Sequence, residues 1–193
     1  RPPDDAPMYP GASNTELCPT RFFTGDPLYK AGCEPDAVEK LRRREVYWHP
    51  YHQALSGELS RLRSMHANVL LWDAHSIRGE IPWLFDGKLP DLNVGTANGL
   101  SAAESVGLAV IEACAQQNKF THVLNGRFKG GYITRCYGNP QEGIHAIQLE
   151  KCQSVYMNEL PPYEYKPELA AQVQPLLHNM VSAALNQVKS LSL

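Results

Sequence analysis

The chain has 193 residues, of which 43% are hydrophobic and 20% are charged, and its formal net charge is −2 at pH 7. This length suffices for one domain with a sizeable core, and the composition is typical of a soluble globular protein. The small net charge and the absence of a long basic run exclude a nucleic-acid-binding surface, and no apolar run is long enough to span a membrane. The five cysteines are far apart in sequence and form no CxxC pair, which indicates a reducing, cytoplasmic compartment.

The start of the sequence is rich in proline, glycine and aspartate and begins at Arg1 without an initiator Met or a signal peptide. We therefore expect the chain to be one domain, residues 1–193, that is incomplete at its N-terminus. Residues 1–34 contain too few apolar side chains for a core element, which predicts an ordered loop or arm.

Helical spacing of apolar residues begins at Pro35, and Pro50 should kink or split this helix because proline lacks the amide donor. Residues 68–72 follow as an apolar run without polar alternation. Such a run is typical of a strand covered on both faces, and we expect it to end at Asp73.

The second half alternates in the same way. Ser101 and Glu104 have the spacing of a capping box, which predicts a helix that begins there and ends near residue 117. Strands are predicted at 121–124 and 143–149, and closing helices at 151–159 and 168–189. Helices that alternate with strands indicate an α/β sandwich with a largely parallel sheet.

His75 would lie just past the predicted end of the first strand. In α/β enzymes the carboxyl ends of the strands are where ligands and chemistry are placed. A lone histidine is also compatible with a purely structural role, and this alternative stays open from the residue alone.

Residues 125–135 directly follow the second predicted strand and contain three cations and three glycines. Arginine binds carboxylates through two parallel hydrogen bonds, and glycine lets the backbone approach a ligand closely. If the strands are parallel, this anion-binding segment lies at the same edge of the sheet as His75. The alternative is a plain hairpin with solvated charges.

Glu150 would end the third strand. A half-buried carboxylate at a strand end has a raised pKa, which suits a general base. The alternative is a surface glutamate at the start of the next helix, where it would complement the helix dipole.

Residues 71–78, 84–91, 125–135 and 142–150 closely resemble, in the same order, the N-formylglutamate amidohydrolase family, whose members are also called N-formylglutamate deformylases. The resemblance extends over nearly the whole chain. It implies a zinc-carboxypeptidase-like (phosphorylase/hydrolase-like) three-layer sandwich in which helices cover a largely parallel or mixed sheet. It also implies hydrolysis of N-formyl-L-glutamate to formate and L-glutamate, the last step of one route of histidine degradation.

The resemblance also implies roles for individual residues. His75 would be a zinc ligand, and Glu150 would be the base and then the acid that serves the attacking water. Arg135 or Arg127 would bind a substrate carboxylate, and Arg1, the end of an Asn-Arg element of the family, would bind one as well. Two arginines suit a small dicarboxylate substrate, and zinc is the implied cofactor.

Two features depart from the family pattern. The family's upstream metal-binding histidine element would precede Arg1, and Cys136 stands where the family usually has histidine. Two other functions therefore stay open beside the zinc deformylase. One is a related amidohydrolase for another N-acyl amino acid or peptide, and the other is an inactive, truncated remnant that binds dicarboxylates.

Overall fold

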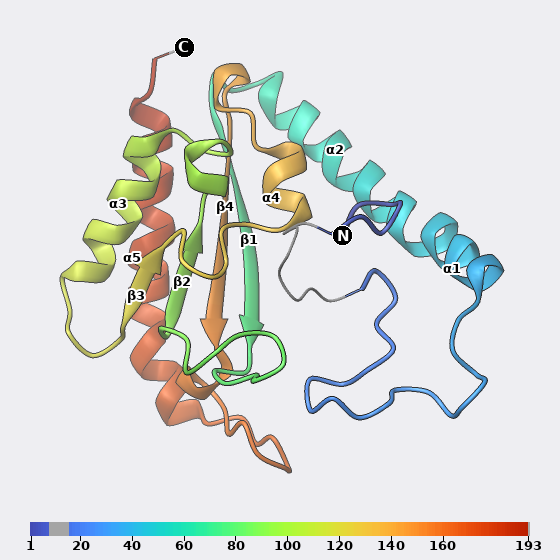
Figure 1. Ribbon diagram of the computed structural model, residues 1–193. Coiled ribbons are helices and arrows are strands. Elements are labelled where there is room, and N and C mark those ends of the chain that lie inside the picture. The colour runs from blue at the N-terminus through green and yellow to red at the C-terminus, as the bar shows by residue number, and fades with distance from the viewer. Residues whose placement is uncertain (8–15, 193) are drawn as a thin grey trace.

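The structure, a computed structural model, describes residues 1–7 and 16–192. Its centre is a four-stranded sheet in the order β1-β4-β2-β3 (Figure 1). The strands are β1 (Val69–Ile77), β2 (Leu92–Gly95), β3 (His122–Leu124) and β4 (Ile144–Cys152). The fold is therefore α/β, as predicted from the sequence.

The sheet is mixed. β1 runs parallel to β4, β2 runs antiparallel to β4, and β3 runs parallel to β2. The carboxyl ends of β1 and β3 consequently point to opposite ends of the sheet. The expectation that residues 125–135 leave β3 at the end of the sheet where β1 finishes is therefore wrong.

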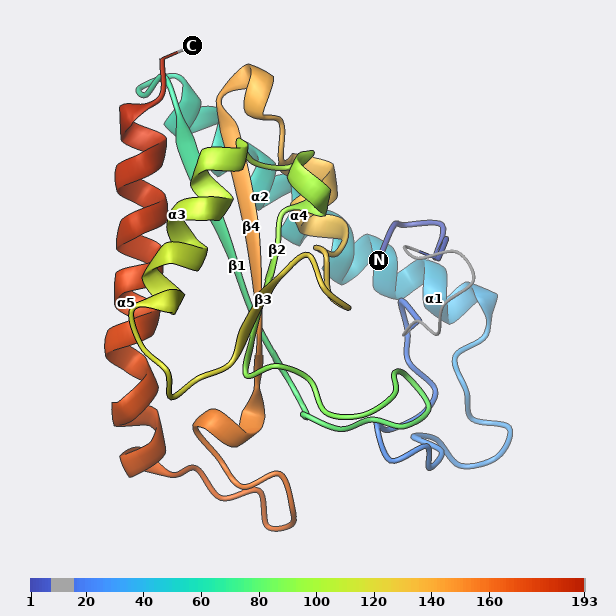
Figure 2. The ribbon, with the colours of Figure 1, turned by 60° about the vertical axis from the view of Figure 1, so that its left-hand side comes forward.

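Helices cover both faces of the sheet (Figure 2). One face carries α3 (Glu104–Ala115) and α5 (Pro167–Ser190), which pack against each other. The other face carries α2 (His49–Arg63) and the short α4 (Tyr132–Tyr137). Because α4 packs on β4 and β1, we call this second face the α4 face of the sheet.

The helix predicted from Pro35 is divided as expected. α1 (Ala37–Arg43) passes through a π-helical turn, Arg44–Trp48, into α2, whose first turn contains Pro50. Because proline has no amide hydrogen and crowds the preceding turn, the backbone widens just before it.

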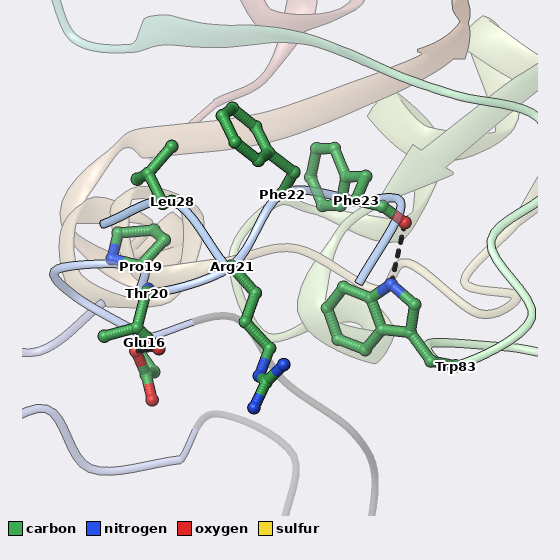
Figure 3. A pocket seen from close by; sticks show the side chains of 8 residues that line it. All are labelled: Glu16, Pro19, Thr20, Arg21, Phe22, Phe23, Leu28 and Trp83. Carbon is green, nitrogen blue, oxygen red and sulfur yellow. Dashed lines mark hydrogen bonds between the residues drawn. The ribbon is translucent and has the colours of Figure 1, made fainter. Parts of the chain in front are cut away.

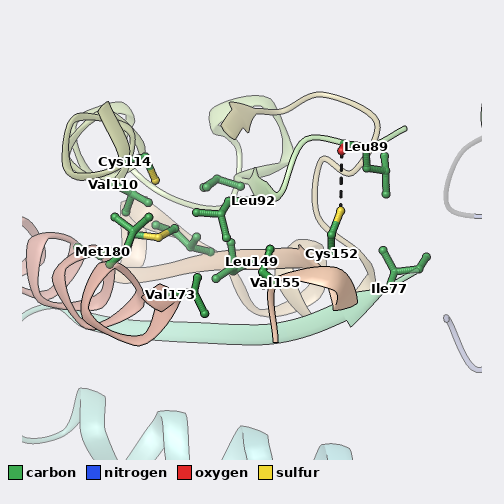
Figure 4. Close-up of a cluster of buried hydrophobic side chains, with 14 of the residues drawn as sticks. Ile77, Leu89, Leu92, Val110, Cys114, Leu149, Cys152, Val155, Val173 and Met180 are labelled. Atoms are coloured by element: carbon green, nitrogen blue, oxygen red, sulfur yellow. Dashed lines mark hydrogen bonds between the residues drawn. The ribbon is translucent and has the colours of Figure 1, made fainter. Parts of the chain in front are cut away.

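The main core lies between the sheet and the pair α3 and α5 (Figure 4). Its members include Leu92 and Leu149 of the sheet, Val110 and Cys114 of α3, and Val173 and Met180 of α5. α5 repeats buried residues at helical spacing over its whole length, which explains why the sequence predicted it well. Because the main core lies on this face of the sheet, polar residues can occupy the opposite face without interrupting it.

Several expected boundaries are wrong. β1 continues through His75, which therefore lies within the strand and not past its end. Glu150 was expected to end its strand, but β4 continues to Cys152. β1 is also an edge strand with exposed residues, not a strand covered on both faces. The helix expected at 151–159 is replaced by the end of β4 and a 3₁₀ turn, Gln153–Val155.

The capping box predicted at Ser101 is absent. α3 begins at Glu104 after Ala103, and the Ser101 hydroxyl instead donates to the carbonyl of Ala146 at 2.8 Å. Two further 3₁₀ turns, Ala97–Gly99 and Pro140–Glu142, lie in connections. No helix of the described residues has the length and apolar character needed to cross a membrane.

Candidate active site

Two rows of residues cross the α4 face of the sheet. His75 of β1, Glu150 of β4 and Asn93 of β2 are aligned partners and form the first row. Asp73, Gln148 and Gly95 are aligned in the same way and form the second row, two residues away along each strand. Residues two apart on a strand share a face, so both rows point the same way.

His75 is held by its neighbour in the second row. Its Nε2 lies 2.9 Å from Asp73 Oδ1, and its side chain is 46% exposed. The hydrogen bond to Asp73 raises the pKa of His75, because the carboxylate stabilises the imidazolium. The ring is therefore oriented by Asp73 while one side remains open to solvent.

Glu150 is the buried carboxylate of the first row, with 7% of its surface exposed. Burial raises the pKa of Glu150 to about 7, since a charged carboxylate loses hydration there. A carboxyl group that titrates near neutral pH is able both to accept and to donate a proton. The structure thus places Glu150 beside His75, two residues before the last residue of β4.

Asn93 and Gln148 are buried polar residues that the sequence analysis did not single out. Asn93 donates to the carbonyl oxygens of Pro90 at 2.8 Å and Glu150 at 3.1 Å, which fixes the backbone of Glu150. The alternation of β4 was the available signal for Gln148, because it stands two residues before Glu150.

Arg135 belongs to α4, which lies over β4 and β1. Its Nε donates to the carbonyl of Gly130 at 2.8 Å, and its backbone amide donates to Gly131 at 3.1 Å. The preceding loop lies directly on the sheet, because a Cβ atom at Gly95 would be 2.5 Å from the nitrogen of Gly130. Residues 125–135 therefore form a loop followed by the start of α4, and the alternative of a plain hairpin is wrong.

Arg1 is connected to the first residue of α4, Tyr132. The indole Nε1 of Trp48 donates to the carbonyl of Arg1 at 3.1 Å, and the Trp48 ring lies 5.7 Å from that of Tyr132. The guanidinium of Arg1 binds Asp5, with a distance of 2.9 Å from Nε to Oδ1. Arg1 and α4 are thus connected through Trp48.

Arg127 is placed differently. Its Nη2 donates to the carbonyl of Leu84 at 3.2 Å, and its guanidinium lies 5.4 Å from the ring centre of Phe128. Arg127 therefore ties the loop after β3 to the loop after β1. Cys136 is exposed on α4, and all five cysteines are free.

A complete metal site does not form among the described residues. Catalytic zinc usually takes three protein ligands, whereas residues 1–7 and 16–192 contain no group of three or more His, Cys, Asp or Glu side chains arranged to hold a metal ion. His75, oriented by a carboxylate, is suited to be one ligand.

A separate apolar pocket of about 420 Å³ lies between residues 16–28 and the loop after β1 (Figure 3). Phe23 stacks on Trp83 at 6.3 Å between ring centres, and the Trp83 indole donates to the Phe23 carbonyl at 2.8 Å. Neither His75 nor Glu150 lines this pocket, so it is distinct from the two polar rows.

Comparison with known proteins decides the family. The model of the N-formylglutamate amidohydrolase family matches residues 1–157. The chain belongs to the N-formylglutamate amidohydrolase family. An N-formylglutamate deformylase of Pseudomonas putida is 50% identical over 185 residues, and one of Pseudomonas aeruginosa is 44% identical over 185 residues. Both alignments cover 96% of this chain and 69% of the relative.

A solved structure agrees with the fold of this family member. The crystal structure of N-formylglutamate amidohydrolase from Ralstonia eutropha JMP134 matches with a TM-score of 0.68 at 21% identity. The match covers 80% of this chain and 57% of that chain, so the chain spans little more than half of the solved protein.

Proposed function

We propose that the protein hydrolyses the formyl amide of N-formyl-L-glutamate to give formate and L-glutamate. The observation that carries this proposal is the pairing of His75 with the buried Glu150 in a chain 50% identical to an N-formylglutamate deformylase. In this proposal the substrate is a small dicarboxylate, and the reaction adds water across one C–N bond.

Glu150 is the proposed proton carrier. Its pKa of about 7 lets it take a proton from the water that attacks the formyl carbon. It then gives that proton to the glutamate nitrogen as the C–N bond breaks. The proton is conserved within the site, so Glu150 ends each turnover in its starting state.

The arginines are the proposed carboxylate ligands. Arg135 belongs to α4, which packs on β4 and β1, and Arg1 contacts Trp48, whose ring lies beside Tyr132 of α4. A guanidinium forms paired hydrogen bonds to a carboxylate. Arg127 is kept as the alternative to Arg135, because it contacts the loop after β1, whereas Arg135 belongs to the helix that packs on β4 and β1.

Zinc is proposed as the metal, with His75 as one ligand and the remaining ligands outside the described residues. Zinc would polarise the formyl oxygen and acidify water. A zinc-carboxypeptidase-like layering of the sheet and helices belongs to the same proposal. The five free cysteines support a reducing, cytoplasmic location.

The test is an assay of the full-length gene product with N-formyl-L-glutamate, in which formate and glutamate are both quantified. N-formyl-L-alanine and N-acetyl-L-glutamate serve as comparison substrates, because each lacks one proposed recognition element. We expect the highest kcat/KM with N-formyl-L-glutamate. Equal or faster turnover of N-formyl-L-alanine would contradict recognition of a dicarboxylate.

A further inference from the structure

Gln148 is a buried polar side chain in the second row, with 5% of its surface exposed. It stands two residues before Glu150 on β4 and faces the same side of the sheet. Burying an amide in this position is costly unless its polar atoms are hydrogen-bonded. Its partners therefore indicate what the residue does.

The two ends of the Gln148 amide contact two different parts of the site. Its Oε1 accepts from the backbone N–H of Gly131 at 2.6 Å, and its Nε2 lies 3.4 Å from Glu150 Oε2. The orientation of the amide follows from chemistry, because a backbone N–H only donates and so must face the oxygen. The NH₂ group is thereby directed toward the carboxylate.

Gly131 is the residue from which α4 begins. Its carbonyl accepts from the backbone amide of Arg135, while Gly130 accepts from the Arg135 guanidinium. The fit to Gln148 is close, since a Cβ atom at Gly131 would be 3.2 Å from Gln148 Oε1. Whatever holds Gly131 therefore also sets the position of Arg135.

Gly95 completes this connection from the neighbouring strand. It is the aligned partner of Gln148 and has no side chain, so the backbone at residues 129–130 lies directly on it. The loop thus packs directly on Gly95 and is hydrogen-bonded to Gln148 at Gly131.

We propose that Gln148 is a positioning residue that couples the segment carrying Arg135 to the carboxylate of Glu150. Its oxygen anchors the start of α4, and its NH₂ group orients Glu150, so that the carboxylate-binding arginine and the proton carrier keep a fixed separation. This inference rests on the proposed function, in which Arg135 binds the substrate and Glu150 carries the proton.

The first test uses Gln148→Met and Gln148→Glu in the full-length gene product. Methionine has a similar length but neither polar group, so KM should rise at least fivefold and kcat/KM should fall by about 10- to 100-fold. Glutamate keeps an oxygen for Gly131, so its KM should return to within threefold of the parent. A KM in Gln148→Glu as high as in Gln148→Met would overturn the anchoring role.

Ser101→Ala is the matched structural control. Ser101 is buried and also hydrogen-bonds to β4, through the carbonyl of Ala146. Its loss should lower the melting temperature while kcat and KM stay within twofold of the parent. If Gln148→Met behaves in the same way as Ser101→Ala, Gln148 is merely structural and the proposal fails.

A double-mutant cycle tests the contact with Glu150. In the parent, Gln148→Met should lower kcat, whereas in a Glu150→Gln background it should lower kcat no further, because the group it orients is gone. If Gln148→Met lowers kcat by the same factor in both backgrounds, Gln148 does not act through Glu150.

Hydrogen–deuterium exchange gives a readout that does not require turnover. The Gly131 amide should exchange at least tenfold faster in Gln148→Met than in the parent or in Gln148→Glu. Unchanged protection would refute the anchoring. A parent enzyme that is inactive on N-formyl-L-glutamate would contradict the proposed function instead, and the exchange rates would still decide the role of Gln148.

Discussion

His75 and Glu150 are direct partners across β1 and β4, and their side chains leave the same face of the sheet. The two strands are parallel, so the alignment continues on both sides of this pair. A half-exposed imidazole thus stands next to a buried carboxylate whose pKa is raised to about 7 by burial.

Glu150→Gln tests the proposed proton carrier. The amide keeps the shape of the side chain but cannot accept the proton, so kcat should fall by about 10² to 10⁴ with little change in KM. Steady-state kinetics on the full-length gene product would measure this. A variant with parental turnover would refute the assignment.

Arg135→Lys tests the proposed carboxylate ligand. A lysine ammonium cannot reproduce a two-pronged hydrogen bond, so kcat/KM for N-formyl-L-glutamate should fall by about 10- to 100-fold. Arg61→Lys is the control, because Arg61 is exposed on α2 and paired with Glu58. Equal kinetics for both variants would assign Arg135 to the protein surface.

His75→Ala tests the proposed zinc ligand. Elemental analysis of the full-length gene product should give about one zinc per chain, and the variant should lose most of it because one ligand is removed. His178→Ala is the control, because His178 is exposed on α5, and this variant should retain its zinc. We also expect residues 1–193 alone to hold little zinc at equal free zinc. Full zinc occupancy of residues 1–193 would contradict this expectation.

The sequence predicted the elements that local patterns determine. α5 and β3 lie close to their expected bounds, since apolar spacing and β-branched composition mark them directly. β2 was missed because four residues, Leu92–Gly95, give too short a pattern. α4 was missed because it has six residues and follows two glycines.

Long-range contacts determined the rest. The hydroxyl of Ser101 bonds to Ala146 of β4 instead of capping α3, so a tertiary contact overrides the local capping signal. The direction of β2 relative to β4 arises from strand pairing and has no local signature. His75 and Glu150 were found by residue type and family resemblance, whereas Gln148 required knowledge of what its amide touches.

Gly95→Ala tests the close approach of the loop to the sheet. The new Cβ would be 2.5 Å from backbone atoms of Lys129 and Gly130, so the loop must shift. We expect a loss of about 1 to 3 kcal/mol in the free energy of unfolding and a higher KM. Gly57→Ala in α2 is the control, because nothing lies within 4 Å of its Cβ position. Its free energy of unfolding should increase by about 0.5 to 1 kcal/mol. Denaturant titration of both variants measures the difference, and equal stabilities would rule out the steric argument.

His145 should make the stability of the protein depend on pH in mild acid. This residue is buried, its Nδ1 accepts from the amide of Ala103 at 3.2 Å, and burial lowers its pKa. Above the unfolded-state pKa of about 6.5, both states are neutral and His145 adds no pH dependence. Below it the unfolded chain binds a proton that the folded protein does not.

The free energy of unfolding should therefore fall as the pH drops below 6.5, by up to about 1.4 kcal/mol per pH unit from this residue. His145→Gln removes the titrating group and offers an amide oxygen to Ala103, so its stability should depend less on pH over this range. Urea denaturation of both proteins between pH 7 and 5 isolates the contribution of His145, because all other ionisable residues are the same in the two proteins. Parallel stability profiles would show that His145 does not titrate differently in the two states.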